Sequence, residues 1–374
     1  MRDVLSELET WWRAGDTVGL GTVVGTWKSS PRQPGAAMLV GPDDTVVGSV
    51  SGGCVEGAVF ELAAQSRDGG SLRLQRYGIS DDDAFEVGLT CGGIIDIFVE
   101  PVNRDTFPEL GEIAQDVRGG VPVAVATLVA GDETRVGKRL VVRADRADGS
   151  LGSQRLDDAV RDDVRGMLEQ GKTGLMHYGP DGERRGDELT VFVNSFAPPP
   201  RMIVFGAIDF AAAVARAGAF LGYRVTVCDA RPTFATPKRF PDADEVVVEW
   251  PHRYLARTEV DSRTVLCVLT HDPKFDVPLL EVALRLPVAY VGAMGSRRTN
   301  EDRLAKLREL GLGEDELSRL HAPIGMDVGA RTPEETAISI AAEIIAARWG
   351  GTGAQLRQTA GPIHHELETA APRR

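Results

Sequence analysis

Two short segments near the N-terminus each combine a cysteine with two glycines. They are Gly52-Gly53-Cys54 and Cys91-Gly92-Gly93. Glycine lets backbone N–H groups approach a ligand closely, and a thiolate beside such a loop can act as a nucleophile or a metal ligand. The apolar pattern of residues 45–50 predicts a strand, and that of residues 55–62 predicts a helix. We therefore expect Cys54 on the first turn of a helix, where the macrodipole favours a negative charge.

A purely structural role explains the same two cysteines equally well, because free cysteines are usually small core residues. Cys228 and Cys267 lie in apolar runs that are typical of buried parallel strands, so we expect both in the core. The four cysteines occupy separate segments without close-pair spacing. This pattern predicts reduced thiols in a cytoplasmic protein.

The composition predicts a soluble globular protein of two or three domains, with 374 residues of which 43% are hydrophobic. A net charge of -13 argues against a surface for nucleic acid or for an anionic membrane. The sequence has neither an apolar run long enough to span a membrane nor the apolar core of a signal peptide. We expect no nucleic-acid partner and no membrane insertion.

Three consecutive prolines at 198–200 predict a stiff linker, because proline joins neither a helix nor a central strand. Beyond them, apolar strand-like runs alternate with amphipathic helical patterns, which indicates a parallel sheet covered on both faces. We predict a Rossmann-like, doubly wound domain over residues 198–350 and a flexible tail over 351–374. The strand-like runs are 202–205, 224–228, 245–249, 264–269 and 288–291.

The region before the linker has a mixed α/β pattern that occurs twice. The segment from Gly21 to Cys54 resembles the segment from Ala126 to Arg155, which precedes a helix predicted at 157–169. The second copy has no Cys-Gly-Gly element. We predict an α/β domain over residues 1–105 and a degenerate repeat, or a continuation of that domain, over 106–197.

The first predicted Rossmann strand runs into Gly206, where a dinucleotide-binding fold places a G-x-G-x-x-G/A turn. Ala211 fits the third position, but Ile208 replaces the second glycine and would obstruct phosphate. Asp229 closes the second strand, where an acidic residue binds a ribose hydroxyl. The match is partial, and it supports an alternative function as an NAD(P)-dependent oxidoreductase.

Two further loops follow predicted strands, and ligands of open α/β sheets bind beyond the carboxyl ends of strands. His271 could serve as an acid, a base or a metal ligand. Asp272 is compatible with a site and also with a plain helix cap before a proline. The second loop carries groups that suit an anion, since backbone donors and guanidinium groups both match phosphate. These groups are Gly295, Ser296, Arg297 and Arg298.

The order of these segments resembles the XdhC/CoxI family, whose members help to mature molybdenum hydroxylases such as xanthine dehydrogenase and CO dehydrogenase. The resemblance covers nearly the whole chain. The segments that carry it are Ser30-Pro31-Arg32 with Pro34-Gly35, Gly52–Glu56, Cys91–Gly93, Thr270–Asp272, Gly292–Arg298 and Pro323–Glu335.

The resemblance implies a chaperone that binds the molybdenum cofactor (molybdopterin or its dinucleotide form), protects its sulfurated state and inserts it into a hydroxylase apoenzyme. It also implies contact with a cysteine desulfurase. Carried onto this sequence, it implies that Cys54 and Cys91 contact molybdenum, with Gly52, Gly53, Gly92 and Gly93 beside them. Glu56 would either orient the loop or move a proton.

The Rossmann region would then hold the phosphate or nucleotide part of the cofactor at Gly206 and at Ser296–Arg298. One departure is Gly206-Ala207-Ile208-Asp209, which stands where family members have a glycine-rich turn followed by histidine. The cysteine site is therefore the preferred one. A second alternative is a sulfur-transfer enzyme with Cys54 as nucleophile. Four scattered cysteines cannot supply the iron–sulfur ligands of the dehydrogenase itself. We expect a homodimer.

Overall fold

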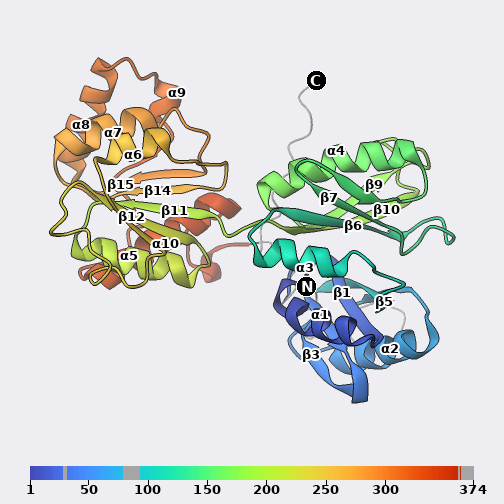
Figure 1. The fold of residues 1–374 in the computed structure, drawn as a ribbon. Coiled ribbons are helices and arrows are strands. Elements are labelled where there is room, and N and C mark those ends of the chain that lie inside the picture. The colour runs from blue at the N-terminus through green and yellow to red at the C-terminus, as the bar shows by residue number, and fades with distance from the viewer. Residues whose placement is uncertain (28–31, 79–92, 361–362, 364–374) are drawn as a thin grey trace. The chain divides into compact units, whose positions relative to one another are not determined.

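The computed structural model describes residues 1–27, 32–78, 93–360 and 363. The chain divides into two compact units, Met1–Pro198 and Pro199–Arg374 (Figure 1). The division falls within the three prolines, which form no helix or strand. Among the described residues, no helix is both long enough and apolar enough to cross a membrane.

The first unit contains two five-stranded antiparallel sheets with the same strand order. In the first sheet the order is β3 (Val46–Gly48), β2 (Ala37–Val40), β1 (Val18–Trp27), β5 (Ile94–Val102) and β4 (Arg73–Tyr77). In the second it is β8 (Ala147–Gly149), β7 (Arg139–Arg143), β6 (Val123–Ala130), β10 (Leu189–Phe196) and β9 (Gly174–Tyr178). The helices of this unit are α1 (Leu5–Ala14), α2 (Glu56–Gly69), α3 (Leu110–Arg118) and α4 (Gln154–Gln170).

Helix α2 packs unusually close to β1, and two glycines of that strand make this possible. A Cβ at Gly19 would collide with the backbone of Ala63 on α2, and a Cβ at Gly21 would lie 2.9 Å from Val59. Val59 and Ala63 are fully buried against the sheet. The N-terminus of α2, with the Cys54 segment before it, is therefore held at a fixed height over the first sheet.

The register of the first sheet places several strand ends at one edge. Strand β1 ends at Trp27 opposite Ile94, and β4 ends at Tyr77 opposite Ile95. Strand β3 ends at Gly48, opposite Met38 near the start of β2. The C-terminal ends of β1 and β3 and the N-terminal end of β5 consequently lie at the same edge of the sheet. The motifs singled out in the first half of the sequence are next to these strand ends along the chain.

The second unit is built on a six-stranded parallel sheet in the order β13-β12-β11-β14-β15-β16, which is the Rossmann order 3-2-1-4-5-6. This confirms the predicted α/β fold with a C-terminal Rossmann-like domain. The strands are β11 (Arg201–Phe205), β12 (Arg224–Asp229), β13 (Glu245–Val248), β14 (Val265–Val268), β15 (Tyr290–Ala293) and β16 (Leu320–His321).

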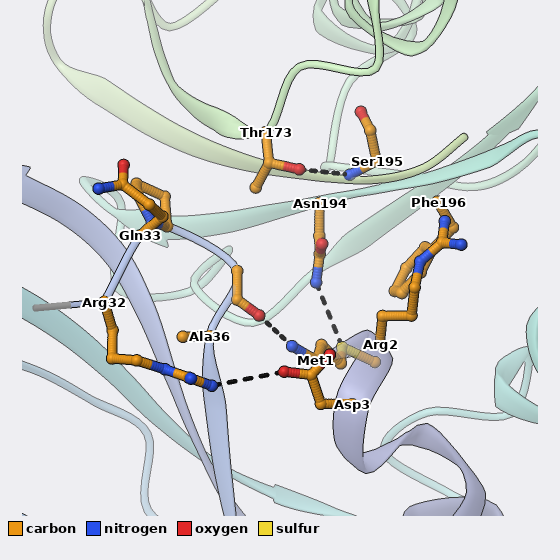
Figure 2. Close-up of a pocket in the computed structure, with 12 residues that line it drawn as sticks. Met1, Arg2, Asp3, Arg32, Gln33, Ala36, Thr173, Asn194, Ser195 and Phe196 are labelled. Atoms are coloured by element: carbon orange, nitrogen blue, oxygen red, sulfur yellow. Dashed lines mark hydrogen bonds and ion pairs between the residues drawn. The ribbon is translucent and has the colours of Figure 1, made fainter. Parts of the chain in front are cut away.

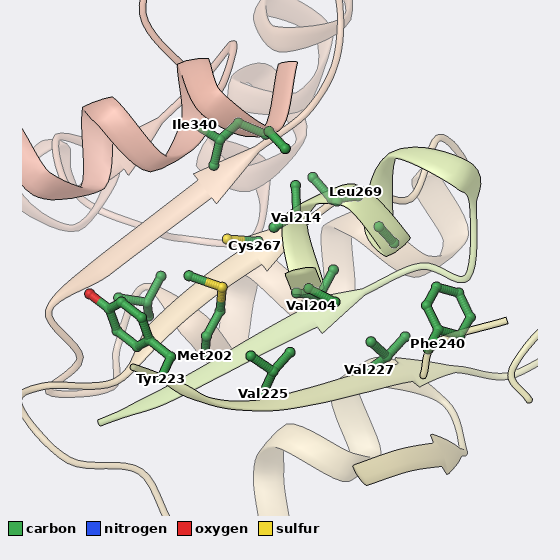
Figure 3. Packing of buried hydrophobic residues seen from close by; sticks show 14 of the residues in the cluster. Met202, Val204, Val214, Tyr223, Val225, Val227, Phe240, Cys267, Leu269 and Ile340 are labelled. Atoms are coloured by element: carbon green, nitrogen blue, oxygen red, sulfur yellow. The ribbon is translucent and has the colours of Figure 1, made fainter. Parts of the chain in front are cut away.

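Helices cover both faces of this sheet. Helices α5 (Asp209–Phe220) and α10 (Pro333–Trp349) share one core, in which Val214 and Ile340 meet Val204 and Val227 of the strands (Figure 3). The opposite face packs against α6 (Pro251–Arg257), α7 (Pro273–Ala283), α8 (Arg297–Glu309) and α9 (Glu314–Leu317).

A buried ion pair joins α7 to α8 beneath the loops after β14 and β15. Asp276 and Arg303 lie 2.9 Å apart, with side chains 4% and 3% exposed. Thr270 donates a hydrogen bond to the same carboxylate, and Arg303 also donates to the carbonyl of Met294. Burial raises the pKa of Asp276, while Thr270 and Arg303 act to lower it. The pair fixes both loops to the sheet.

We expect Asp276→Ala to lower the free energy of unfolding by about 3–5 kcal/mol, because it leaves a buried guanidinium without its counter-charge. Urea unfolding would measure the loss. Asp302→Ala, an exposed change on the same helix α8, is the matched control and should stay within about 0.5 kcal/mol of the parent. A loss below about 1 kcal/mol for Asp276→Ala would contradict a stabilising role of the pair.

Candidate functional site

The loop before α2 is organised around one carboxylate, that of Glu56. Its two oxygens accept hydrogen bonds from hydroxyl groups and backbone N–H groups of the residues just before it. The backbone donors are Ser51 at 2.9 Å, Gly52 at 2.9 Å, Gly53 at 2.8 Å and Val55 at 3.2 Å. The hydroxyl donors are Ser49, at 2.7 Å, and Ser51. The loop therefore wraps around its own anion.

This geometry corrects two expectations. Cys54 does not lie on the first turn of the helix, because α2 begins at Glu56 and Cys54 precedes it by two residues. The N–H groups of Gly52 and Gly53 do not face a ligand, because Glu56 already accepts them. The carboxylate supplies the negative charge that the helix N-terminus favours. The thiol, and not the backbone, is the group that this loop presents.

Glycine is required at 52 and 53 by the backbone angles and not by lack of space. Their φ values are +78° and +119°, and a Cβ on either residue would meet no atom within 4 Å. Side chains rarely adopt such angles, so the turn that wraps the carboxylate depends on the glycine pair.

Glu56 stays ionised at any physiological pH. Burial acts to raise the pKa of Glu56, but the hydrogen bonds from Ser51 and Ser49 outweigh it and hold the value at about 2. A group with so low a pKa is a poor proton carrier near neutral pH. Of the two roles considered for Glu56, orienting the loop is the one that this geometry favours.

Cys54 differs from the two cysteines of the second unit. Its side chain is half-buried, and its backbone N–H donates to the hydroxyl of Ser51 at 2.9 Å. Cys228 and Cys267 are fully buried, and burial raises the pKa of each thiol to about 12. Both are core residues, as expected. Among the three described cysteines, Cys54 is the one with a partly exposed side chain.

The second cysteine motif lies largely outside the described residues. Cys91 and Gly92 belong to the segment that the structure leaves out, and Gly93 is a buried residue just before β5. Within the described ranges, no group of three or more histidine, cysteine, aspartate or glutamate side chains is arranged to hold a metal ion.

The second half of the first unit keeps the same loop without the thiol. There Asp157 of α4 accepts hydrogen bonds from the Ser150 hydroxyl and the Leu151 N–H, both at 2.7 Å. By position, Asp157 corresponds to Glu56 and Arg155 corresponds to Cys54, but α4 begins earlier, at Gln154, so Arg155 lies in its first turn. Two copies of one scaffold therefore differ in the residue that they expose.

A cavity of about 420 Å³ lies between the two halves of this unit (Figure 2). The segment of residues 32–36 lines one side, and Thr173 with residues 194–196 lines the other. Arg32 and Asp3 also line the cavity, and 3.4 Å separates their charged atoms (Figure 2). The sequence pattern missed this cavity, because its walls are far apart along the chain and carry no local signal.

In the second unit, the acidic residue expected to bind ribose is already engaged. Asp229 accepts from the backbone N–H of Ala207 at 2.7 Å and forms an ion pair with Arg231 at 2.9 Å. Although burial acts to raise the pKa of Asp229, these partners lower it. A ribose would have to displace Arg231, and Ile208 stands where the second glycine of the fingerprint belongs.

The other candidate residues of the second unit gather at the carboxyl edge of the sheet. Gly206 has φ +109°, and a Cβ there would lie 3.0 Å from the N atom of Thr270. Leu269 donates to the carbonyl of Phe205, and Met294 to that of Val268, so the loops after β11, β14 and β15 are neighbours. The structure brings Gly206, the His271 loop and the Gly295 loop together.

Their side chains have ordinary local roles as well. Asp272 caps α7 by accepting from the N–H of Lys274 at 3.1 Å, and Ser296 caps α8 by accepting from Thr299 at 3.1 Å. His271, Arg297 and Arg298 are exposed. This edge offers positive charge and a helix N-terminus to an anion.

The chain matches two related family descriptions over most of its length. Residues 202–344 match the XdhC Rossmann domain, and residues 11–78 and 117–179 match the XdhC and CoxI family. The latter two segments contain equivalent parts of the two antiparallel sheets.

Two curated proteins are similar over nearly the full length. A probable xanthine dehydrogenase subunit of Bacillus subtilis is 27% identical over 88% of this chain and 92% of its own. The molybdenum cofactor insertion chaperone PaoD of Escherichia coli is 26% identical over 90% of this chain and 85% of its own.

A crystal structure described as a xanthine dehydrogenase from Bacillus halodurans has the same fold. Its TM-score is 0.67 at 24% identity, and the match covers 95% of this chain and 97% of that one.

We expect Glu56→Gln to lower the free energy of unfolding by about 1–3 kcal/mol at pH 7, because it weakens several charge-assisted hydrogen bonds at once. A carboxylate whose pKa is lowered by folding stabilises the folded state at pH values above its pKa in the unfolded chain. This stabilisation is lost as the pH falls toward the pKa in the folded state. The difference between parent and variant should therefore shrink between pH 4.5 and about 2. Urea unfolding at several pH values would measure it.

Glu61→Gln, at an exposed position of the same helix, is the control and should show neither effect. A Glu56→Gln difference that stays constant down to pH 3 would show that the carboxylate charge does not hold the loop.

Proposed function

Because the chain belongs to the XdhC and CoxI family, we propose that it is a maturation chaperone for a molybdenum hydroxylase. In this role it binds the molybdenum cofactor as cargo, shields its sulfurated form and inserts it into a xanthine dehydrogenase- or CO dehydrogenase-type apoenzyme. The names of the relatives support this proposal, since one is a molybdenum cofactor insertion chaperone and another is a probable xanthine dehydrogenase subunit.

The observation that carries the proposal is the Cys54 loop. Its backbone donors are satisfied by Glu56, and its half-buried thiol is the soft, partly exposed group that the loop offers to a ligand. Thiolates are soft ligands and suit a metal–sulfur centre. A loop held by an internal carboxylate needs no ligand to keep its shape, which suits a protein that must both take up and release its cargo.

The remaining parts of the proposal concern the second unit and the partners. The edge formed by Gly206 and Ser296–Arg298 would take the nucleotide part of a dinucleotide form of the cargo, because exposed arginines and a helix N-terminus favour anions. A cysteine desulfurase is the expected source of cofactor sulfur, and we propose a cytoplasmic homodimer. The engagement of Asp229 by Arg231 weighs against the alternative of an NAD(P)-dependent oxidoreductase.

We expect Cys54→Ala to reduce retention of the molybdenum cofactor at least about tenfold, which corresponds to the loss of about 1.4 kcal/mol of binding free energy. The protein would be loaded with cofactor released from a donor enzyme and then desalted. Bound molybdenum would be read by metal analysis and bound pterin by fluorescence after oxidation.

Arg155→Ala is the matched control, since Arg155 corresponds to Cys54 in the repeat and lies in the first turn of α4, and this variant should retain the cofactor fully. Cys91→Ala tests the second motif in the same assay. Retention unchanged in Cys54→Ala, or tight NAD(P) binding in place of cofactor binding, would overturn the proposal. A persulfide on Cys54 without bound pterin, detected by mass spectrometry, would instead favour the sulfur-transfer enzyme.

A further inference from the structure

The cavity between the two halves of the first unit contains a buried amide with an unused acceptor. Asn194 is 8% exposed, and its Nδ2 donates only to the thioether sulfur of Met1, at 3.4 Å (Figure 2). Its Oδ1 accepts no hydrogen bond among the described residues. Although the residue is largely buried, Oδ1 is open to solvent. An acceptor on a largely buried side chain in the wall of a cavity is available to a ligand, and such placed polar groups are typical of small-molecule sites.

The internal repeat supplies a reference for this position. Asn194 pairs with Val125 on β6, and the corresponding residue of the first sheet, Glu100, pairs with Leu20 on β1. Glu100 is 6% exposed and forms a buried ion pair with Arg139. The same site in the fold is thus closed by a protein partner in one sheet and left open in the other.

The backbone of Gly35, in the opposite wall of the cavity, lies close to Asn194. Gly35 has φ +92°, and a Cβ there would lie 3.4 Å from Oδ1 of Asn194 and 3.2 Å from Thr173. Any larger residue would be strained and would narrow the cavity at the amide. The wall also carries positive charge, because Arg32 extends over the opening and is 3.4 Å from its acidic partner Asp3.

Backbone hydrogen bonds connect one wall of the cavity to the start of the Cys54 loop. Ala36 lines it, and the next residue, Ala37, accepts a hydrogen bond from the N–H of Ser49 at 3.1 Å. Ser49 is in turn a donor to Glu56. The cavity wall and the Cys54 loop are thus linked through the backbone of Ala37 and Ser49.

We infer that this cavity binds the pterin portion of the cargo, an inference that rests on the proposed function. The pyrimidine edge of a pterin carries N–H donors that match the open Oδ1 of Asn194, and a phosphate on its side chain matches the guanidinium of Arg32. A volume of about 420 Å³ lies within the range of small-molecule sites. The hydroxyls of Thr173 and Ser195 are engaged within the same wall, by the Ser195 N–H and the Lys172 carbonyl, which leaves Asn194 as the polar contact for the pterin ring.

The test uses two metal-free probes, 6-hydroxymethylpterin and the same compound phosphorylated on its hydroxymethyl group. Quenching of pterin fluorescence by the full chain would give the dissociation constants. We expect Asn194→Leu to weaken both probes at least about tenfold, as loss of one good hydrogen bond predicts. Arg32→Gln should weaken only the phosphorylated probe, by about tenfold.

Arg73→Gln, at an exposed position on strand β4, is the control and should leave both constants unchanged. Thermal unfolding would show whether Asn194→Leu folds, and Arg32→Gln, at a position near the surface, decides the matter if it does not. Equal affinities in the parent and both variants would overturn the inference.

The outcomes separate this inference from the proposed function. A parent protein that retains molybdenum cofactor but binds neither pterin probe refutes the cavity and leaves the chaperone role standing. A parent that binds the probes through Asn194 but retains no molybdenum supports the cavity and refutes the chaperone role.

Discussion

The carboxylate of Glu56 is the constraint on which the first half of the molecule depends. It gathers the donors of Ser49, Ser51, Gly52 and Gly53 into one turn and at the same time begins helix α2. Because α2 is pressed onto β1 through two strand glycines, the turn has a fixed place on the sheet. These two facts fix the backbone on which Cys54 lies.

The internal repeat separates what the scaffold needs from what the function needs. Both copies keep an acidic residue that accepts from a preceding serine, and both bury the apolar residues on either side of the loop, Val50 and Val55 in one copy, Leu151 and Leu156 in the other. These features therefore belong to the fold. The copies diverge at two positions, Cys54 against Arg155 and Glu100 against Asn194. The first copy contributes the Cys54 thiol to the proposed ligand binding, and the second contributes the Asn194 amide.

Much of the fold was predictable because its signals are local. Continuous apolar runs predicted the parallel sheet, and the helix predicted at 157–169 is found at 154–170. The site was harder. The pattern placed Cys54 on the helix. Apolar periodicity does not reveal that the Glu56 carboxylate organises the preceding loop, so that the helix begins only at Glu56. It also left Asp229 open to ribose, since the pairing with Arg231 depends on side-chain geometry. The cavity at Asn194 joins residues distant along the chain, which no local pattern reports.

The backbone N–H groups of the Cys54 loop are hydrogen-bonded to Glu56, and this also bears on how cargo would leave the loop. A loop that is ordered only by its ligand loses its hydrogen bonds when the ligand dissociates, so dissociation is slow and costs free energy. Here the turn is complete around Glu56 alone, so cargo binding would require no new backbone hydrogen bonds in the loop. The barrier to transfer is then set by the contacts of the cargo itself. A client site with more ligands can draw the cargo away without any part of this loop having to unfold.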